Sequence, residues 1–144
     1  MSQYYELNGI TLWNPSNGAS RLFSSHVRFF EGELGISSGI GRMESDVCEV
    51  DPVVLEMFLS TVLAWRRRTG HAVVQALSDG FLATLLVIAR RAGITMSLSA
   101  VVDHGAAGMQ DAQAGPNPLP GHGGEFEWIA TIREHARQLD RFMP

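Results

Sequence analysis

The chain has 144 residues, of which 45% are hydrophobic and 18% charged, and its formal net charge at pH 7 is −4. This size and composition predict one domain with a genuine core. The acidic balance excludes nucleic acid and a polybasic membrane contact as expected partners, because both need clustered cations. The single cysteine, Cys48, excludes an internal disulfide and fits a reducing compartment.

Two further features favour a cytoplasmic protein without a membrane anchor. The first residues, MSQYYELNG, have neither the basic nor the apolar region of a secretory signal. The longest apolar run, 81–89, is far shorter than the roughly 18 residues that span a bilayer.

Residues 4–13, YYELNGITLW, predict a β-hairpin. Asn8-Gly9 is typical of a type I′ turn, because both residues tolerate positive φ. This turn gives the strand pairs Leu7–Ile10, Glu6–Thr11, Tyr5–Leu12 and Tyr4–Trp13. Strand alternation then predicts a core face and a mixed second face that ends in the Tyr4–Trp13 pair. The expected core face consists of Tyr5, Leu7, Ile10 and Leu12.

Apolar residues at helical spacing predict four helices, over about 17–34, 52–69, 71–92 and 125–143. Gly35 is the expected stop of the first helix, and Asp51-Pro52 the expected start of the second. The inner stripe of the first helix is predicted to comprise Ala19, Leu22, Phe23, His26, Val27, Phe30 and Leu34. The third helix is apolar on most of its circumference, so we place it at the centre.

These elements predict an α+β fold, with an N-terminal β-hairpin packed on a three-helix core and a tethered C-terminal amphipathic helix. The expected divisions are a core domain over 1–103, a flexible Gly/Pro-rich linker over 104–124 and the last helix within 125–144. Residues 35–50 are predicted to form a loop. Residues 94–103 fit either an edge strand or a surface segment.

No motif predicts catalysis, a cofactor or a metal. Residues 35–39 match G-x-S-x-G, but a helix precedes the motif where a nucleophile elbow needs a strand, so a loop is expected. The acidic residues around Cys48 lack the calcium-loop pattern and the Cys or His partners that zinc requires. Three arginines at 66–68 are explained by the C-terminal end of a helix.

Trp13, His26 and Trp65 are candidates to line an apolar ligand pocket. His26 leads, because its spacing places it beside Phe23 and Phe30 on an otherwise apolar helix face. The pocket is expected between the hairpin and the first helix. The competing interpretation of His26 is a packed core residue with one satisfied hydrogen bond.

Four segments together resemble a family of small uncharacterised actinobacterial proteins: LWNPSNGASRLF, SGIG, DVCEVDP and GFLATLLVIARRAG. The resemblance covers about residues 2–95. It implies a bacterial cytoplasmic setting and carries no activity or site residue.

The leading functional hypothesis is a non-enzymatic protein–protein interaction or accessory module. A hairpin leaves two unpaired strand edges, and a second copy can pair with one of them to form a homo-oligomer. The expected interface residues are Tyr4, Thr11, Trp13 and Trp128, and the last helix can dock in cis, on another subunit or on a protein partner. The alternative is a protein that binds a small apolar metabolite, or a small enzyme, with its pocket near Trp13 and His26.

Overall fold

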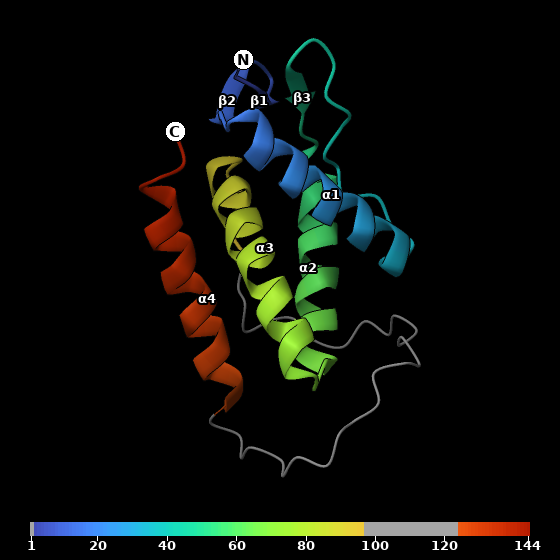
Figure 1. Ribbon diagram of the computed structural model, residues 1–144, viewed down its shortest axis with the longest axis vertical. Helices are drawn as coiled ribbons and strands as arrows, with labels where there is room; N and C mark the ends of the chain where they lie inside the picture. The colour runs from blue at the N-terminus through green and yellow to red at the C-terminus, as the bar shows by residue number, and fades with distance from the viewer. Residues whose placement is uncertain (1, 97–123) are drawn as a thin grey trace.

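The computed structural model describes residues 2–96 and 124–144, of which 124–126 are described by their backbone alone (Figure 1). It has the predicted α+β fold, with a small sheet at one end of a helical body. The elements are β1 (Tyr4–Leu7), β2 (Ile10–Trp13), α1 (Asn17–Leu34), β3 (Val47–Glu49), α2 (Pro52–Arg68), α3 (Ala72–Arg91) and α4 (Gly124–Asp140). The predicted linker lies outside the described residues except for Gly124, and so do residues 97–103.

The helix ends confirm the sequence signals. The Ser16 hydroxyl accepts the backbone N–H of Ala19 at 3.4 Å at the start of α1, and Gly35 ends this helix with φ 64°. The Asp51 carboxylate accepts two backbone N–H groups of the first turn of α2. Such caps satisfy donors that have no partner within the helix.

The sheet differs from the prediction in two ways. It has three strands in the order β2-β1-β3, with β3 parallel to β1, so the prediction that 35–50 is entirely loop is wrong. An irregularity between Tyr5 and Glu6 also changes the hairpin register, so that Tyr5 and not Tyr4 lies opposite Trp13. The two pairs next to the turn, Leu7–Ile10 and Glu6–Thr11, are as predicted.

The changed register brings Trp13 into the core. Tyr5, Leu12 and Trp13 are buried, whereas Ile10, predicted on the core face, is 67% exposed. Tyr5 stacks on Trp13 with ring centroids 5.3 Å apart, and Phe23 meets the edges of both rings. Aromatic pairs of this geometry stabilise beyond the area they bury. The pocket predicted between the hairpin and the first helix is therefore filled by aromatic packing.

Helix α3 lies between α2 and α4 (Figure 1), which confirms its predicted central position. It runs parallel to α4, as the ion pairs of Arg90 and Arg91 at its C-terminal end with Asp140 at the C-terminal end of α4 show. Among the described helices, α3 alone is long and apolar enough to cross a membrane by length and composition. The central helix of a globular core meets the same two criteria.

The prediction of two unpaired hairpin edges is wrong for β1, which pairs with β3, whereas β2 remains an edge strand of the sheet. On the free side of β2, Arg91 donates to the Leu12 carbonyl at 2.7 Å, and the Asn14 N–H donates to the Pro144 carbonyl at 3.1 Å. On the other side, β3 pairs with β1 and is itself bonded to residues 41–44.

Candidate functional site

An apolar groove lies where α1 crosses the end of α2 and the first half of α3. Its volume is about 400 Å³. The lining side chains come from all three helices: Ser25, His26, Phe29 and Phe30 from α1, Trp65 from α2, and Val74, Leu77 and Ser78 from α3. Among the described residues, no formally charged side chain lines it. A concave and mostly apolar surface of this size suits an apolar ligand or a partner side chain.

The groove lies among large apolar side chains that extend into solvent. Phe29 is 54% exposed and Leu77 is 71% exposed, and both line the groove. Leu22 and Val73 lie one helical turn from His26 and Leu77 and are 63% and 60% exposed. We call these four residues, together with the groove, the α1–α3 apolar surface. Ala19 and Leu22 were predicted on the inner stripe of α1, but both are exposed, so the prediction is wrong at these two positions.

His26 forms the polar feature of the groove. Its Nδ1 lies 2.8 Å from the Leu22 carbonyl oxygen, which makes Nδ1 the protonated nitrogen, and its ring stacks on Phe81. In the described part of the chain, Nε2 has no hydrogen-bond partner and can accept one from a bound molecule. The hydroxyls of Ser25 and Ser78 donate to carbonyls of their own helices. This arrangement supports binding and assembles no nucleophile with a base among the described residues.

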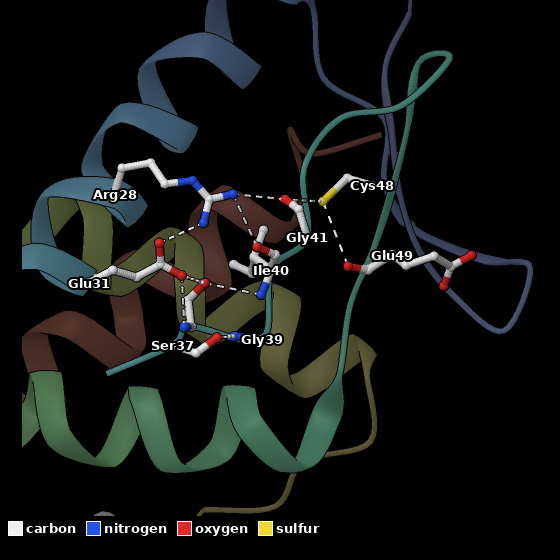
Figure 2. A network of polar contacts seen from close by, with 9 residues as sticks. Arg28, Glu31, Ser37, Gly39, Ile40, Gly41, Cys48 and Glu49 are labelled. Atoms are coloured by element: carbon white, nitrogen blue, oxygen red, sulfur yellow. Dashed lines mark hydrogen bonds and ion pairs between the residues drawn. The ribbon is translucent and has the colours of Figure 1, made fainter. Parts of the chain in front are cut away.

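The side of α1 away from the groove is held by a polar network (Figure 2). Arg28 donates to the Glu31 carboxylate at 2.6 Å and to the carbonyls of Ile40 and Gly41. The Glu31 carboxylate also accepts the N–H and O–H of Ser38 at 2.9 and 2.6 Å. These bonds tie the loop after α1 to the helix.

The same bonds determine the charge state of Glu31. Burial raises the pKa of this carboxyl, but the hydrogen bonds from Ser38 and Arg28 outweigh burial and hold the pKa below its ordinary value. The ionised carboxylate therefore stabilises the fold.

Glu31→Gln is expected to lower the free energy of unfolding by about 1–2 kcal/mol at pH 7. Because the pKa of Glu31 is lower in the folded chain than its unfolded value of about 4.3, its contribution is complete above that pH and is lost as pH falls through the folded pKa. Urea titrations should show the wild type and variant converging as the pH is lowered below about 4.3. Glu33→Gln, exposed on the same helix, is the control. A deficit as large at pH 3 as at pH 7 would contradict the role of the ionised carboxylate.

The loop motifs are structural. Residues 35–39 follow a helix, as expected, and the Ser37 hydroxyl accepts the N–H of Gly39 at 3.3 Å. Cys48 is buried, its thiol donates to the Gly41 carbonyl, and burial raises its pKa to about 11. A thiol in this state is a poor nucleophile, because the thiolate is the reactive form.

The structure brings together two of the three predicted pocket residues. His26 and Trp65 line the groove, whereas Trp13 is packed in the core. Of the predicted interface residues, Tyr4 is half-buried and Thr11 is exposed on the sheet. Trp128 lies beneath the Arg66 guanidinium, 4.7 Å from the ring centroid, so it packs within the chain.

Phe29 and Leu77 were missed as candidate site residues. Phe29 falls outside the predicted inner stripe of α1, and an apolar residue opposite a core face signals a second apolar surface. Leu77 gave no separate signal, because α3 is apolar on most sides.

The described residues form a small α+β domain with an exposed apolar groove, and no catalytic centre is recognised among them. Over residues 1–144 the chain matches the family model described as a family of unknown function, DUF6086, and it belongs to that family. The match includes the linker and the last helix, which the predicted resemblance over 2–95 left out. No curated protein and no solved structure matches the chain.

Proposed function

We propose that this protein is a non-enzymatic interaction module that forms homo-oligomers through the α1–α3 apolar surface. The observation that carries the proposal is the gathering of Leu22, Phe29, Val73 and Leu77 around one groove, each more than half exposed. Exposed apolar patches beside a hollow are typical of interaction sites. The β1 edge of the hairpin is paired with β3 within the chain, and Trp13 is buried, so we place the interface at the groove and not at the hairpin.

A second copy is the occupant that fits this surface. The chain carries a net charge of −4, so two copies repel one another over much of their surface. The described residues that line the groove carry no formal charge, so contact between two such linings brings no like charges together. The α1–α3 apolar surface also combines a hollow with projecting side chains. Phe29 and Leu77 line the groove, and each is more than half exposed beside it. A two-fold interface requires such self-complementarity.

Leu77→Glu tests the proposal against Met57→Glu. Both side chains are more than half exposed on a helix, but Met57 lies on α2 and does not line the groove. In sedimentation at graded concentrations, the wild type should self-associate, and Leu77→Glu should weaken association roughly thirtyfold, equivalent to about 2 kcal/mol for a central interface residue. Met57→Glu should associate like the wild type. A wild type that stays monomeric at several hundred micromolar, or equal effects of both variants, would overturn the proposal.

The alternative, a protein that binds a small apolar metabolite in the groove, is supported by the Nε2 of His26. This nitrogen lacks a partner in the described chain, and one polar group in an apolar hollow can orient a ligand. A native mass spectrum separates the two functions. A bare oligomer supports the interaction module, and a monomer that carries a fixed small mass supports ligand binding.

We also propose a bacterial cytoplasmic setting, of the actinobacterial kind that the sequence resemblance implies. Its support is Cys48, which is free and buried and so suits a reducing compartment.

A further inference from the structure

A second cavity lies on another part of the molecule, between α3 and α4. Its volume is about 330 Å³. We propose that it binds an amphipathic anion, namely a molecule with an apolar chain that ends in a carboxylate. This proposal is independent of the α1–α3 apolar surface, because the two cavities share no lining residue.

The body of the cavity is apolar. Leu59 of α2, Leu86 and Val87 of α3 and Ala136 of α4 contribute to its lining. Leu59 and Val87 are buried core residues, so this part of the wall is rigid. An apolar chain in this space exchanges water for hydrocarbon contact, which favours binding in proportion to the area buried.

The side chains of Arg90, Arg133 and Arg137 also line the cavity, and each has guanidinium N–H groups without a partner among the described residues. Arg133 has no hydrogen bond or ion pair within residues 2–96 and 124–144. Arg137 pairs with Glu134 at 3.1 Å, where both side chains are more than half exposed and the pair is therefore weak. Arg90 reaches Asp140 through one nitrogen. A guanidinium carries five N–H donors, so these arginines together can hold a carboxylate.

Arg91, the neighbour of Arg90, uses all three nitrogens of its guanidinium in hydrogen bonds within the chain. Its guanidinium donates to Leu12, Met143 and both the carboxylate and carbonyl of Asp140, and Arg91 does not line the cavity. The structural task of joining the helix ends therefore falls to Arg91. Arg133 has no such task among the described residues, although it lies in a chain with more acids than bases.

The two halves of the site select the ligand class together. A small inorganic anion would leave the apolar lining in contact with water, and an uncharged chain would leave the arginine donors unused. A carboxylate at the end of an apolar chain satisfies both, with its head among Arg90, Arg133 and Arg137 and its chain along the lining.

The test compares decanoate with decan-1-ol, which has the same chain length and no charge, by calorimetric titration of the full chain. Decanoate should bind one to one and at least fivefold more tightly than the alcohol. Arg133→Gln should remove most of that difference. Arg141→Gln should not, because Arg141 follows the end of α4 and does not line the cavity. Equal affinity for both ligands, no binding of either, or equal effects of both variants would each overturn the proposal.

A second pair of variants locates the bound chain. Ala136→Phe places a ring in the cavity and should abolish decanoate binding, and its melting curve shows whether it folds. Leu77→Glu alters only the α1–α3 apolar surface and should leave decanoate binding unchanged. Loss of binding in Leu77→Glu with retention in a folded Ala136→Phe would place the ligand in the groove and overturn the proposal.

Discussion

Gly39→Ala is expected to lower the free energy of unfolding by about 2–5 kcal/mol, although Gly39 lies in a loop. Gly39 has φ +74°, and a Cβ built there would lie 2.7 Å from the Asp51 carbonyl oxygen and 2.8 Å from the Leu55 backbone nitrogen. Both contacts are with backbone at the start of α2, which cannot move aside as a flexible side chain would. The variant therefore combines a left-handed conformation with an overpacked contact.

Gly35→Ala is the matched control, because Gly35 has φ +64° and no heavy atom within 4 Å of a built Cβ. It should cost about 1–2 kcal/mol, the left-handed conformation alone. Urea unfolding of both variants at pH 7 measures the difference, which isolates the close approach at Gly39. Equal losses would show that the start of α2 moves to accommodate the methyl group.

This close approach explains why the loop carries the sequence SGIG. The Asp51 N–H donates to the Gly39 carbonyl at 2.7 Å, and the Glu31 carboxylate holds the preceding Ser38. The loop thereby connects the end of α1 to the start of α2. A serine between glycines resembles a catalytic turn in sequence alone, whereas here the glycines permit backbone contact.

The helices could be predicted because their signals are local. Gly35 and Asp51 act within one turn of their own positions, and each lies at the helix end where it was predicted. The Asn8-Gly9 turn is local too, and both residues have positive φ. β3 could not be predicted, because three residues in an acidic stretch carry no periodic pattern and gain their partner, β1, from far along the chain.

Trp13 shows why the candidate site was only partly predictable. Alternation placed its side chain away from the core face, but packing against Tyr5 and Phe23 buries it through a change of register. His26 and Trp65 were predicted to face apolar surroundings, and they do. The exposure of Leu77 could not be predicted from the sequence. An apolar residue on a helix gives the same pattern whether another element covers it or, as here among the described elements, none does.

Arg91→Ala is expected to lower the free energy of unfolding by about 2–4 kcal/mol, because several acceptors lose their donor together. The Arg91 guanidinium donates to the Leu12 and Met143 carbonyls, each at 2.7 Å, and to the Asp140 carboxylate at 2.9 Å. It therefore joins the sheet, α3 and the end of α4. Arg90→Ala is the control, because Arg90 makes one exposed ion pair and its loss should cost about 1 kcal/mol or less.

Hydrogen exchange distinguishes a local loss from a loss that spreads. If Arg91 holds the end of α4 against β2, its removal should speed exchange along α4 and at the Asn14 N–H, which donates to the Pro144 carbonyl. The parts of α2 and α3 distant from Arg91 should keep their protection against hydrogen exchange. The ion pair of Arg66 with Asp79, which joins these two helices, is left in place in this variant. Unchanged exchange at Asn14 would show that the end of α4 stays against β2 without Arg91.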